Sequence, residues 1–332
     1  VSNEILLWKA TNLFIKDLKF AKVPVRVYQP KAPSAGPRRG VVYLHGGVGL
    51  IGTIKTYEKL CRHVASTSDS VVVCVGYRLA PEHPYPTQFW DCLTATEHFM
   101  TTAEEYGVDP TRIIICGDSS GGTLTTAVCQ TLVNRRDLPK VRAQIILYPF
   151  LQGLDFNLPS YQQNGLVPFL LRERTLTLGM QYLNKDLSLM KDVLDGCHVP
   201  EDLKQKFRKW LSPDNIPMEF KIRGYKPHVP ASYSEKLHVL AKAVFETIFS
   251  PLLAEDAIIC QLPETFILTC EYDVVRDDGL LYKKRLEDNG VPVTWYHVED
   301  GFHGAVYYFD GCFSFQCGRK ALDNVIKFIK GI

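Results

Sequence analysis

The stretch CGDSSGGTL, residues 116–124, holds a serine in a setting suited to nucleophilic chemistry. Its core GDSSG, residues 117–121, fits the pattern G-x-S-x-G, and Ser119 is the central serine. An apolar run typical of a strand precedes it and a helical pattern follows, as in a nucleophile elbow. Glycines permit the close backbone approach of such a turn. We therefore predict that Ser119 is a nucleophile above a helix N-terminus, where negative charge is favoured.

A serine hydroxyl needs a base, and the base needs an orienting acid. In elbow-type sites the acid and then the histidine follow the serine along the chain, each in a loop after a strand. Asp273 directly follows the apolar run FILTCEY, and His303 lies in EDGFHG, just after VTWYHV. We predict that Asp273 is the orienting acid and His303 the base.

Other histidines and aspartates are competing candidates for these two roles. His45 also lies at a strand end but precedes the serine, whereas His297 falls within a strand and His83 in a Pro-rich turn. Asp277 and Asp278 lie farther from the strand, near a helix start, where capping explains them well. We therefore favour the pair named above.

Acyl transfer also requires preorganised N–H groups for the developing oxyanion. The glycines of YLHGG, Gly46 and Gly47, fit the motif expected after an early strand, and Ser120 offers a third backbone amide. We predict that these three amides form the oxyanion hole and that His45 holds the loop through hydrogen bonds. On this interpretation Ser120→Ala keeps most activity, while replacing the nucleophile with alanine abolishes it.

Strand-like and helix-like segments alternate with short connections, which predicts a mostly parallel central sheet flanked by helices on both faces. The strand-like segments are 23–33, which ends at prolines, 39–47, 70–79, 111–122, which runs into the serine turn, 142–150, 264–273 and 292–304, a strand with its loop. The expected helices are 55–66, 88–106, 123–136, 279–290 and 319–329.

Two segments depart from this alternation within what we interpret as a single domain, residues 1–332. Residues 151–259 contain no clear strand, and we predict a mostly helical cap insertion that covers the end of the sheet where sites form. The opening segment is amphipathic, which predicts a helix at about residues 3–18 that packs on the body and contributes to the cap.

Composition and charge exclude several functions. The formal net charge of +2 gives no indication of nucleic acid as a partner. There is no P-loop, no HExxH and no CxxC among the ten scattered cysteines, so we expect neither a metal nor a cofactor. Whether Cys312 and Cys317 form a disulfide cannot be decided from their spacing.

Several motifs resemble those of the hormone-sensitive-lipase branch of the α/β-hydrolases, and most closely those of the arylacetamide deacetylase group. They are HGG at 45–47, YRLAPEHPYP at 77–86, GDSSGG at 117–122, LPSYQQN at 158–164, SPLLAED at 250–256, DVVRDDG at 273–279 and VEDGFHGA at 298–305. The resemblance covers nearly the whole chain and implies the α/β-hydrolase fold with a helical cap.

The resemblance also implies hydrolysis of carboxylic esters, and sometimes of arylamides, without a cofactor. It assigns Ser119, Asp273 and His303 as the triad, with Gly46 and Gly47 as oxyanion donors. It further implies a signal-anchor upstream of Val1 and a catalytic domain on the lumenal side of the endoplasmic reticulum membrane.

Two positions depart from the family pattern. The family has a third glycine where this chain has Val48, and a valine at a positive φ would be strained. The deacetylase also has a cysteine where this chain has Leu50, so we expect Cys270 to lack the disulfide partner that the family would imply.

The leading hypothesis is a serine carboxylic-ester hydrolase that acts on small apolar acyl or aryl esters, and on arylamides, through an acyl-enzyme. The alternative is a weak or inactive protein of the same fold that binds a small lipid-like ligand, and Val48 is the feature that favours it. An epoxide hydrolase or dehalogenase would need an aspartate at the elbow, where this chain has Ser119.

Overall fold

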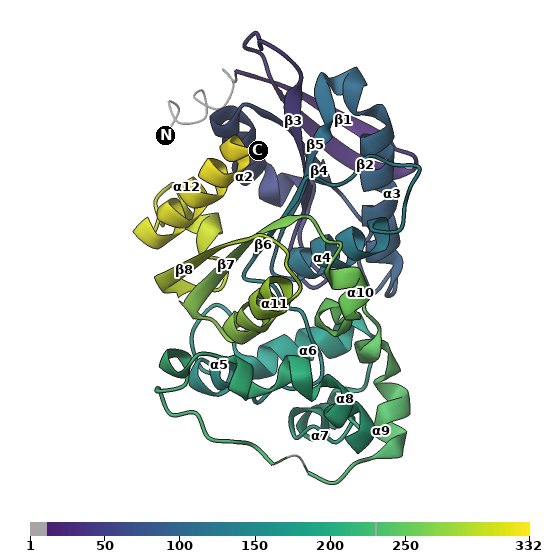
Figure 1. Cartoon of the computed structure of the whole chain (residues 1–332), viewed down its shortest axis with the longest axis vertical. Coiled ribbons are helices and arrows are strands. Elements are labelled where there is room, and N and C mark those ends of the chain that lie inside the picture. Colours follow the sequence, from purple (N-terminus) through teal and green to yellow (C-terminus); the bar gives the residue numbers. More distant parts are fainter. Residues whose placement is uncertain (1–11, 230) are drawn as a thin grey trace.

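The computed structural model describes residues 12–229 and 231–332 and shows a central sheet of eight strands (Figure 1). The strand order is β1-β2-β4-β3-β5-β6-β7-β8. The strands are β1 Leu13–Phe20, β2 Val23–Pro30, β3 Arg38–Leu44, β4 Ser70–Val75, β5 Val108–Asp118, β6 Ala143–Leu147, β7 Glu264–Tyr272 and β8 Val293–Phe302.

The sheet is parallel from β4 to β8, whereas β2 runs antiparallel to both of its neighbours, β1 and β4. In the register of the central strands, Leu44 of β3 lies opposite Gly117 of β5, and Asp118 lies opposite Leu147 of β6. Parallel strands place their carboxyl ends at one edge of the sheet. The loops after β3, β5, β7 and β8 therefore meet at one end of the molecule.

Helices cover both faces of the sheet, which explains why all six residues of β4 are buried. Side chains of α2 and α12 pack in the core on one face, and those of α3, α4 and α11 pack in the core on the other. These helices are α2 Ile54–Ser68, α3 Thr87–Thr102, α4 Ser120–Leu132, α11 Arg276–Asp288 and α12 Gln316–Gly331. The mostly parallel, doubly covered sheet is the α/β architecture that the alternating pattern predicts.

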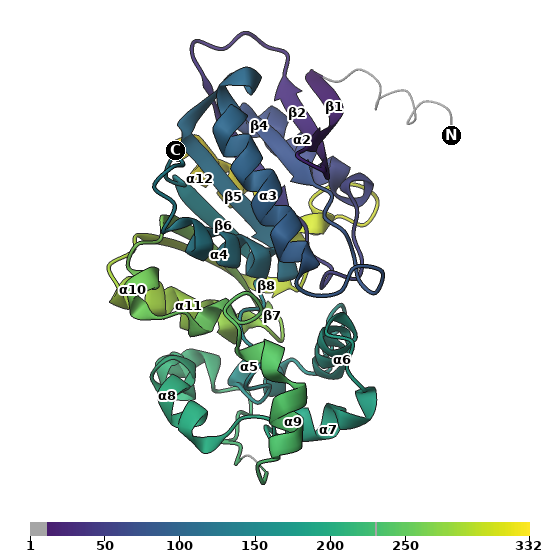
Figure 2. The same cartoon turned by 90° about the vertical axis from the view of Figure 1, so that its right-hand side faces the viewer.

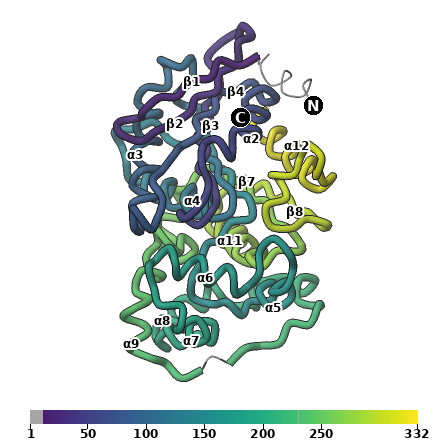
Figure 3. Tube along the Cα trace, turned by 180° about the vertical axis from the view of Figure 1, so that it is seen from behind, coloured from purple at the N-terminus to yellow at the C-terminus, as the bar shows by residue number. Residues whose placement is uncertain are grey.

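A helical insertion joins β6 to β7 and lies beyond the carboxyl ends of the strands (Figure 2). Its α-helices are α5 Pro159–Gln163, α6 Arg172–Tyr182, α7 Met190–Leu194, α8 Glu201–Leu211, α9 Glu235–Leu240 and α10 Asp256–Ile259. Seen from behind, α5 to α9 form one end of the molecule (Figure 3). The segment 151–259 thus contains helices and no strand of the sheet among its described residues.

The two ends of this insertion are hydrogen-bonded to each other. The Leu252 amide donates to the Leu151 carbonyl at 3.0 Å, and the Gly153 amide donates to the Ser250 hydroxyl at 3.0 Å. The chain therefore leaves the sheet and returns to it at neighbouring points.

The prediction of a helix at 3–18 is wrong for the part that the structure describes, and residues 1–11 lie outside the described residues. Residues from Leu13 onward form β1, which pairs with β2 from Leu13↔Pro30 to Phe20↔Val23. The tight turn between these strands contains Ala21, with a φ of 53°. Pairing with an adjacent strand over eight residues outweighs an amphipathic pattern that also fits a helix.

All ten cysteines of the chain lie among the described residues and are free thiols; Cys270 is buried and unpaired, and Cys312 and Cys317 do not form a disulfide. Over residues 12–229 and 231–332, no helix is long and apolar enough to cross a lipid bilayer.

Candidate active site

Ser119 occupies the turn between β5 and α4 with a φ of 55° and a ψ of −123°. Such a backbone conformation is strained for a residue with a side chain and is held by its surroundings. The serine amide donates to the Leu147 carbonyl of the neighbouring strand at 2.9 Å. A Cβ added to Gly121 would lie 2.1 Å from the Leu44 carbonyl oxygen, and one added to Gly117 would lie 2.2 Å from the Gly121 oxygen. The flanking glycines are thus required by close backbone packing.

Three side chains from three strand ends form a continuous hydrogen-bonded row. Ser119 Oγ lies 2.9 Å from His303 Nε2, and His303 Nδ1 lies 2.8 Å from Asp273 Oδ2. Asp273 is 1% exposed, while the histidine side chain keeps 13% of its surface accessible. The structure therefore brings together the three residues that the sequence analysis selected, although they are up to 184 positions apart.

This row can activate the serine. A carboxylate can only accept hydrogen bonds, so Asp273 accepts one from the Nδ1–H group of His303. The unprotonated Nε2 is then left to accept a hydrogen bond from the serine hydroxyl. The imidazole can then receive the proton as Oγ attacks a carbonyl carbon. The buried carboxylate stabilises the imidazolium that forms.

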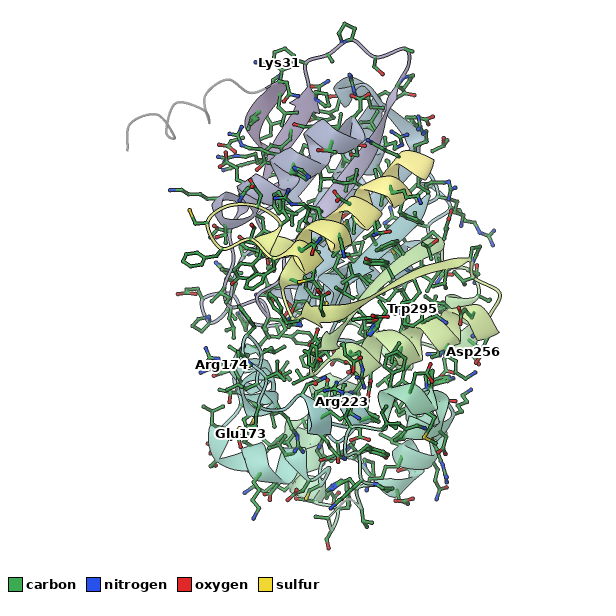
Figure 4. The ribbon with its side chains drawn as sticks, turned by 90° about the vertical axis from the view of Figure 1, so that its left-hand side faces the viewer. Lys31, Glu173, Arg174, Arg223, Asp256 and Trp295 are labelled. Atoms are coloured by element: carbon green, nitrogen blue, oxygen red, sulfur yellow. The ribbon has the colours of Figure 1, made fainter. Side chains whose placement is uncertain are left out.

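The Asp273 loop is fixed from two sides. Its own Oδ1 accepts a hydrogen bond from the Val275 amide at 3.0 Å. From the insertion, the Asn164 side chain donates to the main-chain carbonyls of Asp273 and Glu271, both at 2.9 Å. Arg223 in turn donates to the Asn164 Oδ1 and to the Glu271 carboxylate. Arg223 lies where the insertion meets the body of the protein (Figure 4).

Two of the three predicted oxyanion donors are available. Among the described residues, none accepts a hydrogen bond from the amides of Gly47 and Ser120. Ser120 is the first residue of α4, so its amide also benefits from the positive end of that helix. The Ser120 hydroxyl has a separate contact: it accepts a hydrogen bond from the Val48 amide at 2.7 Å.

The prediction that Gly46 is an oxyanion donor is corrected by the structure. Its amide donates to Asp118 Oδ1 at 3.1 Å and to the Tyr57 hydroxyl at 3.2 Å. Asp118 is buried, and it accepts further hydrogen bonds from the hydroxyls of Tyr43 at 2.8 Å and Tyr57 at 3.0 Å. The Gly46 amide is thus needed to solvate a buried carboxyl group instead of an oxyanion. Burial raises the pKa of Asp118, and the tyrosine hydrogen bonds oppose this rise.

His45 supports the loop, as its position after the strand predicts. Its Nδ1 lies 2.8 Å from the Gly46 carbonyl and 2.9 Å from the Tyr77 hydroxyl, which also donates to the His45 carbonyl at 2.7 Å. The ring stacks on Tyr77 with a centroid distance of 4.1 Å. Burial lowers the pKa of His45 to about 4, so the ring is neutral at pH 7.

Val48 has a φ of 57°, the left-handed conformation that the family pattern leads one to expect at this position. A β-branched residue rarely adopts it, because Cβ crowds the backbone. The valine amide is held by Ser120 Oγ, and Gly49 beside it also has a positive φ of 66°. The loop therefore keeps a glycine-like path in spite of the valine.

A cavity opens directly over Ser119 and is covered by the insertion. It contains about 720 Å³ of empty space, including its mouth, and the described residues that line it include neither a carboxylate nor a lysine or arginine. Apolar and aromatic side chains make up most of the wall, among them Tyr85, Leu124, Phe150, Leu178, Tyr182 and Phe249. Such a lining suits an uncharged apolar ligand with a polar group at the serine.

The competing residues have other roles in the structure. Asp277 accepts a hydrogen bond from the Ser160 amide and pairs with buried Arg276. Asp278 accepts hydrogen bonds from the Leu151 amide and from Gln152, so both carboxyl groups anchor the insertion. His297 contacts Glu271 and Thr269, away from the serine. In the part of the chain that the structure describes, no cluster of His, Cys, Asp and Glu could hold a metal ion.

The sequence analysis missed two contributors to this site, Asp118 and Asn164. Asp118 occupies a variable position of the G-x-S-x-G pattern, and a charged residue at the end of an apolar strand is a signal that could have identified it. Asn164 lies 109 positions from Asp273. It is the last residue of the motif LPSYQQN at 158–164, and this motif is the signal that could have identified it.

Comparisons with known proteins identify the fold and the family of the chain. A family profile described as alpha/beta hydrolase fold matches residues 41–205 and 229–307. The chain is 47% identical to human arylacetamide deacetylase-like 4 over 331 residues, covering 99% of this chain and 81% of that protein. It is 41% identical to arylacetamide deacetylase of Oryctolagus cuniculus over 304 residues, covering 90% and 76% of the two chains.

Solved structures share the same fold. A thermophilic and thermostable carboxylesterase cloned from a metagenomic library superposes with a TM-score of 0.71 at 27% identity, covering 97% of this chain and 89% of that chain. A carboxyl esterase from the fungus Tuber melanosporum gives a TM-score of 0.73 at 21% identity, covering 97% and 87%.

Proposed function

Because the chain belongs to the arylacetamide deacetylase group of the α/β-hydrolase fold, and is thus a carboxylic ester hydrolase, we propose that it cleaves esters through Ser119, His303 and Asp273. The observation that carries this proposal is the unbroken row Ser119 Oγ–His303 Nε2, His303 Nδ1–Asp273 Oδ2, with contacts of 2.9 and 2.8 Å. It lies at the floor of an apolar cavity.

In the proposed reaction, Ser119 Oγ attacks the ester carbonyl carbon while His303 takes the hydroxyl proton. The carbonyl oxygen becomes an oxyanion between the amides of Gly47 and Ser120. His303 then returns its proton to the leaving alkoxide, and the alcohol departs from an acyl-enzyme. Water, deprotonated by the same histidine, releases the acid and restores the serine.

We further propose that the substrate is an uncharged ester with an apolar acyl or aryl group, and that arylamides react by the same steps. The described residues that line the cavity include no Asp, Glu, Lys or Arg. This supports the choice of an uncharged substrate, because a charged one would lose its hydration without gaining an oppositely charged partner. The relatives named as deacetylases are consistent with it.

The proposal is tested with nitrophenyl acetate and a reactive fluorophosphonate. The wild-type protein should release nitrophenolate, and mass spectrometry should locate the phosphonyl group on Ser119. Ser119→Ala should show neither reaction, while the control Ser232→Ala, at an exposed serine of the insertion, should show both. Equal rates for wild type and Ser119→Ala would refute the proposal. Tight binding of an apolar ligand without turnover would favour the alternative of a binding protein.

A further inference from the structure

A second cavity lies beside the active-site cavity, within the insertion. It contains about 520 Å³ of empty space, and Lys185 is the one charged residue among the described side chains that line it. Its walls come largely from α6, α7 and α9 and include Leu176, Met180, Val193 and Leu237. No step of the proposed reaction uses this space.

The two cavities share four lining residues: Phe150, Thr175, Gly179 and Phe249. Phe150 and Phe249 meet edge to face, with ring centroids 5.7 Å apart and planes at 81°. These two rings form one side of the boundary, and α6 forms the other.

Gly179 is an unexpected residue at this boundary, because glycine is less favourable than alanine inside a helix. Its backbone is not among those with a positive φ, and a Cβ added to it would lie within 4 Å of no described atom. Neither backbone conformation nor crowding therefore explains the glycine. What it does provide is empty space in the wall common to both cavities.

The geometry of α6 directs this empty space inward. Thr175, Gly179 and Tyr182 are spaced i, i+4 and i+7, so they share one face of the helix. All three line the active-site cavity. Glu173 and Arg174, on the same helix, are exposed and point away from the body (Figure 4). A side chain at position 179 would thus project toward the boundary between the cavities.

The structure assigns the second cavity to the distal part of a long acyl chain, which passes Gly179 to reach it; this inference rests on the ester hydrolysis proposed above. Helix α6 borders the loop that carries the oxyanion donor, since a Cβ added to Gly49 would lie 2.4 Å from Tyr182 Cε2. We therefore assign the passage beside α6 to the acyl portion of the ester and not to the alcohol. The leaving alcohol must instead lie where His303 can protonate it. The apolar lining would gain from each methylene transferred from water.

The test compares nitrophenyl acetate with nitrophenyl decanoate for Gly179→Leu. The leucine fills the passage, so the ratio of kcat/KM for decanoate to kcat/KM for acetate should fall at least tenfold. Gly179→Ala should keep most decanoate activity. Gly331→Leu is the matched control, because Gly331 is also helical and an added Cβ there meets no described atom, but it lies in α12.

A second variant fills the far cavity without altering the passage. Ala241 is buried and lines only the second cavity, so Ala241→Phe should reproduce the selective loss of decanoate activity. Thermal melting of each variant separates this effect from misfolding.

Three outcomes would overturn the inference. The first is an equal fall of acetate and decanoate activities in a folded Gly179→Leu protein. The second is decanoate activity that persists in both filled variants. The third is a selective loss of activity on decyl acetate, which would assign the cavity to the alcohol. A wild-type protein inactive on every ester refutes the proposed function and the subsite together, whereas wild-type activity on both esters with no selective loss refutes the subsite alone.

Discussion

The Ser120 hydroxyl accepts a hydrogen bond from the Val48 amide at 2.7 Å and so ties the start of α4 to the loop after β3. The same serine offers its own amide to the site. One residue therefore supplies an oxyanion donor and fixes the loop that carries the other donor, Gly47.

Ser120→Ala should retain the reaction but lose more efficiency than the sequence alone led us to expect, because the structure gives the hydroxyl a role in holding the loop. The backbone amide stays in place, whereas the loop loses one hydrogen bond with a net contribution of about 1 kcal/mol. We expect kcat/KM on nitrophenyl acetate to fall between about twofold and tenfold. Ser120→Thr, which keeps the hydroxyl, is the control. An unchanged kcat/KM for the alanine variant would show that the contact does not position the loop.

Val48→Gly should be more stable than Val48→Ala. Both variants lose the isopropyl group, but only glycine removes the Cβ that disfavours a φ of 57°. The left-handed conformation costs an L-residue about 1–2 kcal/mol, while at an ordinary position alanine would be the more stable of the two. Urea unfolding of both variants measures the difference, and a more stable alanine variant would contradict the assigned backbone.

Asn164→Ala should lower both stability and kcat. It removes the 2.9 Å hydrogen bonds to the Asp273 and Glu271 carbonyls and leaves each with one longer contact, from the Arg276 amide and from the Arg223 side chain, both at 3.3 Å. We expect a cost of about 1–3 kcal/mol. The orienting acid is then less firmly held, so we expect a tenfold or greater fall in kcat with little change in KM. Asn324→Ala is the control, because this half-buried asparagine donates its hydrogen bond to the Lys320 carbonyl of its own helix. Loss of stability without loss of kcat would assign Asn164 a purely structural role.

Stability should fall with rising pH because of Asp278. Burial raises the pKa of this carboxyl group to about 8, far above its ordinary value of 3.8. Between these values the folded protein holds a proton that the unfolded chain releases. The stabilisation is thus complete below pH 4 and is lost as the pH rises to about 8, with a slope of at most about 1.4 kcal/mol per pH unit.

Asp278→Asn isolates this effect because the amide does not titrate. The difference in unfolding free energy between wild type and variant, measured in urea at pH 6, 7 and 8, should shift steadily in favour of the variant as the pH rises. Asp118 is buried elsewhere, is common to both proteins and cancels, whereas the neighbouring Asp277 is one cause of the raised pKa of Asp278 and belongs to the effect that is measured. Parallel curves over this range would contradict the raised pKa.

Most of the sheet could be predicted from the sequence because its strands are short apolar runs that end at glycines or polar residues. The segments 264–273 and 292–304 correspond to β7 and β8, with bounds within a few residues. The exception was β1, whose spacing of apolar residues fits a helix as well as a strand. Its conformation depends on pairing with β2, and a single segment does not contain that information.

The three triad residues, Ser119, Asp273 and His303, could be predicted because each has a residue type suited to its catalytic step and directly follows a recognisable strand. The oxyanion hole was harder, because it depends on which amides remain unpaired after folding. Gly46 has the right residue type and position, but buried Asp118 accepts a hydrogen bond from its amide. Long-range contacts such as that of Asn164 depend on packing between the insertion and the body.

The hydrogen bond between Leu151 and Leu252 joins the ends of the helical insertion. These ends are therefore as close in space as the ends of a short connection, although about a hundred residues lie between them. The entropy of closing a loop depends on where its ends lie and only weakly on its length. This part of the chain is therefore suited to exchange: a segment of different length and lining could be grafted between the same two residues. The chemistry of the strand ends and the choice of substrate can in this way change independently.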